Sequence, residues 1–507
     1  MYRIHESSTP SFQSVMETLR TDASVNFNGT GDSTRESSIE ARIRQAFEAQ
    51  RAHRPDVRTQ DAEARISKIQ RLHDHVWARR KEIQAAMYQD FRRPPVEVDM
   101  SEVKMIAEEA EFAMKHLREW MAPEPVPTQR MLVGTRSRIE PTPKGVVCIM
   151  SPWNYPFILT MAPLISALAA GNSVIVKPSE YTPHSSALMA DMIEQLYDPR
   201  EVTLFQGDKE VGQALLEQPF DHFFFTGSPA VGRIVMKAAA EHLSSVTLEL
   251  GGKSPAVVDA SADIDHAATT LVWGKFLNAG QTCIAPDYVL VEESVSDALV
   301  DAMRAAATRS FGSTPSERQQ SADYARIVNE RHFARLSNAL DDAIEQGARL
   351  EYGGTVDARE RYIEPTLLTD VPSTATVMQE EIFGPILPIR SVRHLDDAIA
   401  EIQSRENPLA LYHFTTSESA TRRLLDHTQS GGVCVNDVIV HYLSPHLPFG
   451  GAGHSGIGAS SGRYGFEAFS QKRSVMKREN SAALMQQLYP PYKPVTKKLV
   501  DWLLPWA

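Results

Sequence analysis

Cysteine and long apolar runs are scarce in this 507-residue chain, and basic residues are fewer than acidic ones. Only three cysteines occur, Cys148, Cys283 and Cys434, without the spacing of a disulfide framework or a metal site. We therefore expect reduced thiols, as in the cytoplasm, and no bound metal. Acidic residues outnumber basic ones by 64 to 52, which gives a net charge of −12. Nucleic acid is consequently not an expected partner, because binding its phosphates needs a clustered basic surface.

The longest apolar segment, residues 157–171, is interrupted by Thr160, Pro163 and Ser166. It is shorter than the roughly 20 residues that span a bilayer, so we interpret it as a buried helix. The first ten residues, MYRIHESSTP, contain no apolar core of a signal peptide. These absences favour a cytoplasmic protein.

What is present is an alternation of strands and helices. The length suits two or three domains, and residues 1–36, rich in Ser, Thr, Asn and Asp, are expected to form a flexible extension. Apolar residues spaced by three to four between positions 39 and 87 predict long amphipathic helices. After the proline-rich residues 122–128, the pattern predicts βαβ units and therefore an α/β fold. The predicted strands are 146–150, 173–176 and 222–226, and the predicted helices are 157–170 and 185–196.

A strand-to-helix turn follows the third predicted strand. Ser228 can cap the helix, and Pro229 can occupy its first turn. Gly227 and Gly232 are too far apart for the GxGxxG dinucleotide fingerprint. A glycine turn before a helix N-terminus still offers N–H donors to an anion, so both a pyrophosphate site and an ordinary turn fit this pattern. The helix is expected to bury one apolar stripe, consisting of Val231, Ile234, Val235 and Ala238.

Lys177 and Glu180 follow the strand at 173–176, at the edge where open α/β sheets bind ligands. A cation and a carboxylate at this spacing suit the hydroxyls of an adenosine ribose, and Glu180 disfavours the extra phosphate of NADP by like-charge repulsion. NAD is therefore the expected cofactor, with NADP left open. A solvated ion pair is the alternative interpretation.

Cys283 and Glu249 are the candidate reactive residues. Cys283 lies in FLNAGQTCIAP among polar neighbours, as expected for a thiol that performs covalent chemistry. Cys148 and Cys434 instead lie in apolar runs typical of packed thiols. Glu249 ends the alternating pattern of VTLEL before a double glycine, so a strand delivers a carboxylate to a turn where a base can act. A buried thiol and an unrelated carboxylate would show the same local residues.

Six motifs in order resemble those of the aldehyde dehydrogenase superfamily, in particular its class 3 branch of fatty, aromatic and coniferyl aldehyde dehydrogenases. They are SPWNYPF at 151–157, KPSE at 177–180, FTGSPAVG at 225–232, LELGGKSP at 248–255, FLNAGQTC at 276–283 and EEIFGP at 380–385. The resemblance implies a Rossmann-type cofactor domain, an α/β catalytic domain and a small bridging element that joins subunits as a homodimer. The boundaries that we expect are 37–122 and 144–252 for the NAD-binding domain, 253–448 for the catalytic domain, and 123–143 and 449–487 for the bridging element.

The resemblance further implies that Cys283 is the nucleophile, Glu249 the general base and Asn154 the amide that binds the oxyanion. In that scheme the thiolate attacks a small-molecule aldehyde and hydride passes to the nicotinamide. Water activated by Glu249 then cleaves the thioester to the carboxylic acid. The residues implied to hold the cofactor are Trp153, Lys177, Glu180, Gly227, Ser228, Gly232, Glu381 and Phe383.

Several questions stay open at the level of sequence. His454 stands where relatives usually have asparagine, and it either affects substrate preference or is a tolerated surface residue. The C-terminal tail, residues 488–507, combines aromatic residues with Lys497 and Lys498, and it either packs against protein or contacts a membrane peripherally. The aldehyde is either aromatic or medium- to long-chain aliphatic. Two other functions remain: transfer of the thioester to coenzyme A, against which Glu249 argues, and a catalytically silent NAD-binding or structural homologue.

Overall fold

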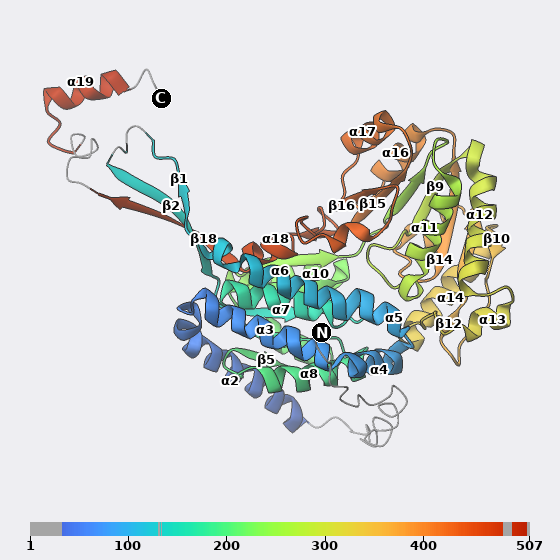
Figure 1. Ribbon diagram of the computed structural model, residues 1–507, viewed down its shortest axis with the longest axis horizontal. Helices are drawn as coiled ribbons and strands as arrows, with labels where there is room; N and C mark the ends of the chain where they lie inside the picture. Colours follow the sequence, from blue (N-terminus) through green and yellow to red (C-terminus); the bar gives the residue numbers. More distant parts are fainter. Residues whose placement is uncertain (1–32, 130–131, 133, 480–488, 504–507) are drawn as a thin grey trace, which may run out of the picture.

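The computed structural model describes residues 33–129, 132, 134–479 and 489–503. Within them the chain forms two large sheets flanked by helices and a smaller sheet that projects as an arm (Figure 1). The predicted extension lies outside the described residues except at its end, because α2 (Ser33–Arg58) begins before residue 36. The predicted α/β class is confirmed, since both large sheets are mostly parallel and alternate with helices.

The first large sheet has the strand order β17-β7-β6-β3-β4-β5 and is parallel except for β17. All of β3 is buried, but Val147 and Ile149 face one core whereas Val146, Cys148 and Met150 face another. This two-sided burial explains why the strand is a continuous apolar run in the sequence. The strands are β3 (Val146–Met150), β4 (Ser173–Lys177), β5 (Val202–Leu204), β6 (His222–Gly227), β7 (Ser245–Leu250) and β17 (Gly456–Ile457).

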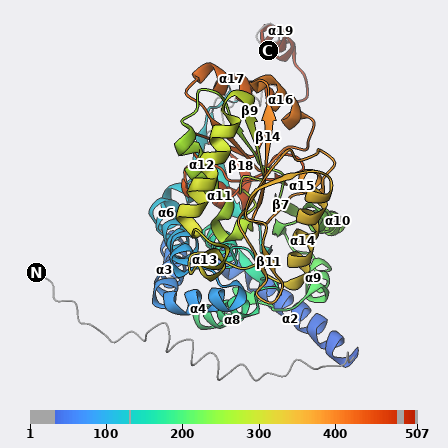
Figure 2. The ribbon, with the colours of Figure 1, turned by 90° about the vertical axis from the view of Figure 1, so that its right-hand side faces the viewer.

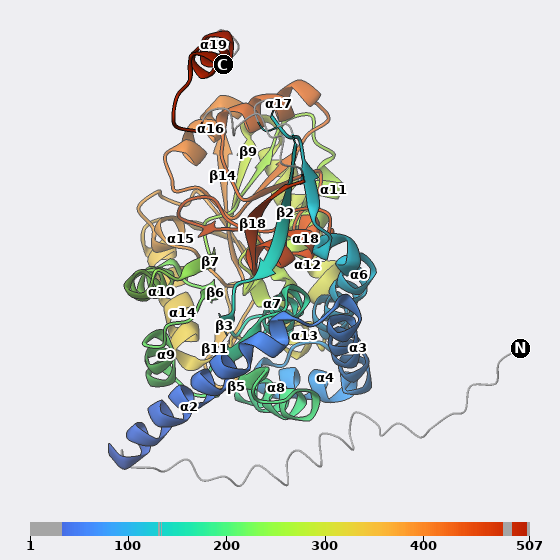
Figure 3. The ribbon, with the colours of Figure 1, turned by 90° about the vertical axis from the view of Figure 1, so that its left-hand side faces the viewer.

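Helices cover both faces of this sheet. One core contains residues of α3 (Ala62–Ala78), α4 (Arg80–Phe91), α6 (Lys104–Met121), α7 (Ile158–Ala170) and α8 (Pro183–Leu196). The opposite core contains residues of α2, α9 (Lys209–Leu216) and α10 (Pro229–His242), and α2 runs diagonally across this side (Figure 3). Between α4 and α6 the chain passes through α5 (Pro95–Val98) and one π-helical turn, η1 (Asp99–Val103).

The predicted apolar stripe of α10 is wrong in part. Val231 and Ile234 are 44% and 55% exposed, and Ala238 is half-buried. The cause is Gly232, where a Cβ would lie 2.7 Å from a methyl carbon of Leu250 and would prevent this close approach of helix and strand. A residue without a side chain therefore sets the contact face of the helix. That face consists of Gly232, Val235 and Ala239.

The second large sheet has the order β10-β13-β14-β9-β8-β15-β16 and is parallel except for β10. Helix α12 (Glu293–Phe311) packs on β9 and β14, beside α11 (Ile264–Phe276) (Figure 2). The strands are β8 (Pro255–Val258), β9 (Tyr288–Glu292), β10 (Arg349–Tyr352), β13 (Thr366–Thr369), β14 (Ile386–Val392), β15 (Ala410–Phe414) and β16 (Gly432–Val435). The other elements here are α13 (Pro315–Gln320), α14 (Glu330–Glu345), α15 (Thr376–Gln379), α16 (Leu395–Gln403), α17 (Glu418–His427) and the pair β11 (Val356–Asp357) and β12 (Tyr362–Ile363).

The arm is a three-stranded antiparallel sheet of β1 (Glu124–Val126), β2 (Thr135–Pro143) and β18 (Ser470–Arg478). It joins two segments that are far apart in the sequence, and α18 (Gly462–Ala468) leads into it. The last described helix, α19 (Pro494–Leu503), lies away from both large sheets (Figure 1). Across the described ranges, no helix combines the length and apolar character needed to cross a bilayer.

Candidate active site

A cavity of about 1200 Å³ is lined by residues of both large sheets and their connections. It brings together the three candidate catalytic residues, Cys283, Glu249 and Asn154. Five of the predicted cofactor residues also line it: Trp153, Gly227, Ser228, Glu381 and Phe383. The other three, Lys177, Glu180 and Gly232, are not among its lining residues in the part of the chain that the structure describes.

Glu249 is held between β6 and the edge strand β17 of the first sheet. It lies near the carboxyl end of β7, is 4% exposed, and pairs in antiparallel register with Gly456 of β17. Its Oε1 accepts a hydrogen bond from the Ser460 hydroxyl. Burial raises the pKa of Glu249 to about 7, and the hydrogen bond from Ser460 opposes this rise. A carboxyl group with a pKa near neutrality can exchange protons at physiological pH.

Cys283 follows a strained turn at the end of α11. In η3 (Leu277–Gly280), Asn278 and Ala279 both have φ of 52°, in the left-handed region. That conformation costs a residue other than glycine about 1–2 kcal/mol. Gly280 follows with φ of 73°, and a Cβ there would collide with the carbonyl oxygen of Gly384. The turn therefore fixes the direction from which the thiol enters the cavity.

Cys283 is half-buried and lines the same cavity as the carboxyl groups of Glu381 and Glu249. Its pKa is raised to about 12 by burial and then by the charges of Glu381 and Glu249, while its own backbone N–H and that of Ile284 favour the thiolate. The other two thiols, Cys148 and Cys434, are buried and free, as predicted for packed cysteines. In the described residues, no group of three or more His, Cys, Asp and Glu side chains is arranged to hold a metal ion.

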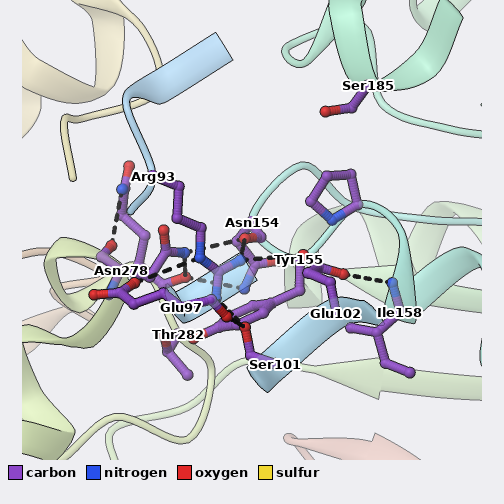
Figure 4. Close-up of polar contacts among 12 residues, drawn as sticks. Arg93, Glu97, Ser101, Glu102, Asn154, Tyr155, Ile158, Ser185, Asn278 and Thr282 are labelled. Carbon is purple, nitrogen blue, oxygen red and sulfur yellow. Dashed lines mark hydrogen bonds and ion pairs between the residues drawn. The ribbon is translucent and has the colours of Figure 1, made fainter. Parts of the chain in front are cut away.

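Asn154 lies in the connection between β3 and α7 and is tied directly to the turn before Cys283. Its Nδ2 donates to the Gln281 carbonyl oxygen at 3.0 Å, and its own carbonyl oxygen accepts from Asn278 Nδ2 at 3.0 Å. The hydroxyl of Tyr155 shares a hydrogen bond with that of Thr282 at 2.8 Å (Figure 4). The Asn154 amide and the residues that precede Cys283 therefore belong to one hydrogen-bonded unit, although their segments are distant in the sequence.

Most cofactor candidates follow the carboxyl ends of strands of the first sheet, and the Glu381 carboxyl lies against Gly251, directly after β7. Ser228 caps α10 as predicted, accepting from Val231 N at 3.4 Å, and Pro229 occupies the first turn. This capped N-terminus beside the cavity suits a phosphate. The rings of Trp153 and Phe383 meet edge to face with centroids 5.3 Å apart.

Two carboxyl groups among these candidates suit ribose hydroxyls. Burial and the nearby Asp287 raise the pKa of Glu381 to about 8. Lys177, the last residue of β4, forms an ion pair with Glu180 at 3.2 Å between Nζ and Oε2, and β4 is the neighbour of β3 in the sheet. Carboxyl oxygens that can accept from ribose hydroxyls and a capped helix N-terminus that can bind phosphate are the groups that a dinucleotide needs.

Comparison with known proteins matches residues 27–475 to the family described as "Aldehyde dehydrogenase family". The chain belongs to this family. It is 43% identical over 465 residues to aldehyde dehydrogenase family 3 member A2 of Pongo abelii, which covers 91% of this chain and 92% of the relative. It is 41% identical over 456 residues to "Aldehyde dehydrogenase, dimeric NADP-preferring" of Mus musculus, with 90% and 97% covered.

A solved structure supports the same assignment. It is described as the substrate-bound state of Staphylococcus aureus AldH, is 41% identical, and matches with a TM-score of 0.86 over 91% of this chain and 99% of that one. The resemblance to the class 3 branch is thereby confirmed. This aldehyde dehydrogenase is an oxidoreductase that acts on aldehydes, and its family uses NAD(P).

The sequence interpretation missed Ser460, the residue that holds Glu249 in this aldehyde dehydrogenase. Ser460 could be found only from the pairing of β17 with β7, which no local sequence pattern predicts. His454, which the sequence singled out, is one of the residues that line the cavity. Its Nδ1 lies 3.5 Å from Arg233 Nη2 on α10 and 3.8 Å from Glu406 Oε1. His454 therefore stands beside the capped turn of α10.

Proposed function

We propose that this aldehyde dehydrogenase oxidises apolar aldehydes, either aromatic or medium- to long-chain aliphatic, to carboxylic acids with NAD(P)⁺. The observation that carries the proposal is the convergence of Cys283, Glu249 and Asn154 on one cavity. Apolar side chains of α6, α7 and η4 (Val440–Leu443) line the same cavity and support an apolar substrate. They include Met105, Ile158, Leu159, Tyr442 and Leu443.

In this scheme Cys283 Sγ forms a bond to the carbonyl carbon, and the thiol proton passes to Glu249 and then to solvent. The carbonyl oxygen gains the electron pair of the broken π bond. It is stabilised by the second N–H of the Asn154 amide and by the backbone N–H of Cys283, because the first amide N–H is already donated to Gln281.

Glu249 acts again in the second half of the reaction. It removes a proton from a water molecule whose oxygen attacks the acyl carbon held on Cys283. The carbon–sulfur bond then breaks, the sulfur takes up the proton held by Glu249 to regenerate the thiol, and the carboxylic acid is released. Bound NAD(P)⁺ supplies the hydride acceptor that makes the net change an oxidation. The residues proposed to hold it are Trp153, Lys177, Glu180, Gly227, Ser228, Gly232, Glu381 and Phe383.

A panel of aromatic and aliphatic aldehydes tests the proposal, with absorbance of the reduced cofactor as the measurement. Each assay is run with NAD⁺ and with NADP⁺, in the presence and absence of coenzyme A, and with the Cys283→Ala variant as control. Carboxylic acid and reduced cofactor without coenzyme A support the proposal. An acyl-CoA product would assign an acylating enzyme instead, and cofactor binding without any turnover would assign a catalytically silent protein.

We also propose that the enzyme is a cytoplasmic homodimer whose subunits meet through the bridging element, with the domain boundaries given above. The exposed apolar residues of α10 and the projecting arm support association. The tail at 488–507 is proposed to pack against its own or the partner subunit, with peripheral membrane contact as the alternative. Light scattering measures the mass, and flotation with lipid vesicles separates the two roles of the tail.

A further inference from the structure

Arg93 is a buried charge close to the site, and the scheme above gives it no role. It is 0% exposed and follows the end of α4. Its Nη2 donates to Ser101 Oγ at 2.7 Å and its Nη1 to Glu102 Oε1 at 3.1 Å, while Nε lies 3.5 Å from Glu97 Oε2. Taking a guanidinium out of water is costly unless carboxylates pair with it, and here two do.

The partners of Arg93 come from an unusual local structure. Ser101 and Glu102 are consecutive residues of η1, the π-helical turn between α5 and α6. Such turns are rare and are frequently found at functional sites. Both side chains of this turn reach the same guanidinium, as Figure 4 shows. The turn therefore serves to surround Arg93 with acceptors.

Arg93 also contacts the segment that carries the oxyanion amide. Its Nη1 donates to the Asn154 carbonyl oxygen at 3.4 Å, and its guanidinium lies 4.0 Å from the ring centroid of Tyr155. The second oxygen of Glu102 accepts from Ile158 N at 2.6 Å. Arg93 and Glu102 thus contact this segment at three residues (Figure 4). They are Asn154, Tyr155 and Ile158.

The other partner of Arg93 reaches the turn before the nucleophile. Glu97 Oε2 accepts from the backbone N–H of Asn278 at 3.1 Å, and Asn278 is the first of the left-handed residues there. Tyr155, which lies under the guanidinium, meets Thr282 immediately before Cys283. Glu97 and Tyr155 therefore each connect the Arg93 guanidinium to the residues just before Cys283.

We propose that Arg93 is a positioning residue that fixes the Asn154 amide and the Cys283 thiol relative to one another. The inference rests on the proposed roles of these two residues. Arg93 is not among the cavity-lining residues in the described part of the chain, so it acts through its neighbours. Its planar fork is required, because a lysine ammonium is a point charge that cannot reach all these acceptors and stack on Tyr155 together.

The test compares Arg93→Lys with a matched control, Arg318→Lys. Arg318 is also buried, pairs with Glu364 and lies 4.8 Å from the ring centroid of Tyr352, away from the cavity-lining residues. We expect kcat for aldehyde oxidation to fall by about 100-fold in Arg93→Lys, as for a displacement of about 1 Å. We expect kcat of Arg318→Lys and the cofactor affinity of both variants to stay near the wild-type values.

A double variant separates positioning from a general loss of stability. If Arg93 acts through the amide, most of the effect of Arg93→Lys disappears in an Asn154→Ala background. Equal losses in both backgrounds, or equal losses in Arg93→Lys and Arg318→Lys, would overturn the proposal. If Arg93→Lys does not fold, Glu97 is replaced instead: Glu97→Gln keeps an acceptor for Asn278 N but loses a charge paired with Arg93, so it should lower kcat less than Glu97→Ala, for which we expect a loss of about tenfold. Equal kcat in these two variants would also count against the proposal.

Alkylation of Cys283 by iodoacetamide gives a readout that does not need turnover. Its rate should change in Arg93→Lys and not in Arg318→Lys, and the other two thiols are buried. An unchanged rate in Arg93→Lys would contradict the proposal. If the wild-type enzyme oxidised no aldehyde, the proposed function would fail, while the alkylation rates would still report whether Arg93 positions the thiol.

Discussion

Replacing Ser460 by alanine tests how the proposed base is tuned. The Ser460 hydroxyl donates to Glu249 Oε1, and a hydrogen bond to a charged group is worth about 1.5–3 kcal/mol. The ionised carboxylate gains most of this energy, so its loss raises the pKa of Glu249 above about 7. At 1.36 kcal/mol for each pH unit, the rise is about one to two units. At pH 7 the ionised fraction then falls from about a half to between about a tenth and a hundredth.

The assay is the pH dependence of kcat under conditions where hydrolysis of the thioester limits turnover. We expect the acid limb of the Ser460→Ala profile to move to higher pH, with kcat at pH 7 about five- to fiftyfold lower and recovered above about pH 9. A pre-steady-state burst of reduced cofactor should become more pronounced at pH 7. Ser460→Thr, which keeps the hydroxyl, is the control. An acid limb that stays in place while the plateau falls would refute the reasoning.

Three further predictions concern single residues. Cys283→Ala should abolish formation of reduced cofactor and keep cofactor affinity, measured by fluorescence titration, and substantial residual turnover would remove Cys283 from its role. Asn154→Ala should raise the barrier by about 2.7–4 kcal/mol, and a loss of kcat below about tenfold would count against an oxyanion contact. Glu180→Gln should raise kcat/KM for NADP⁺ about fivefold, because removing one charge near a phosphate is worth about 1 kcal/mol in water. An unchanged ratio of NADP⁺ to NAD⁺ use would contradict this ribose site.

Local patterns were sufficient to predict the strands and turns that carry the site. The predicted strand at 146–150 coincides with β3, because a strand buried on both faces needs an apolar residue at every position. The cap at Ser228 was predictable for a similar reason, since its hydroxyl acts on an N–H three residues away. The convergence of Cys283, Glu249 and Asn154 was implied only by the resemblance of their motifs to a known family.

Contacts between distant segments could not be predicted from one sequence. Ser460 reaches Glu249 only because β17 adds to the edge of β7, and Arg93 reaches Asn154 only because α4 ends beside the connection after β3. Neither Ser460 nor Arg93 lies in a periodic sequence pattern that would distinguish it from an ordinary polar residue. The predicted contact face of α10 was wrong in part for a different reason. The close approach of helix and strand at Gly232 decided which face is buried, and the positions of the large aliphatic side chains did not.

The addition of β17 to the first sheet bears on how the enzyme is made. A nascent polypeptide that has emerged from the ribosome as far as β16 already contains all strands of the two large sheets except β17. It still lacks the hydroxyl that restrains Glu249, which arrives with the last segment before the arm closes. The environment of the proposed base is therefore completed late in synthesis, and a product terminated after β16 would carry Cys283 and Glu249 without the hydrogen bond from Ser460.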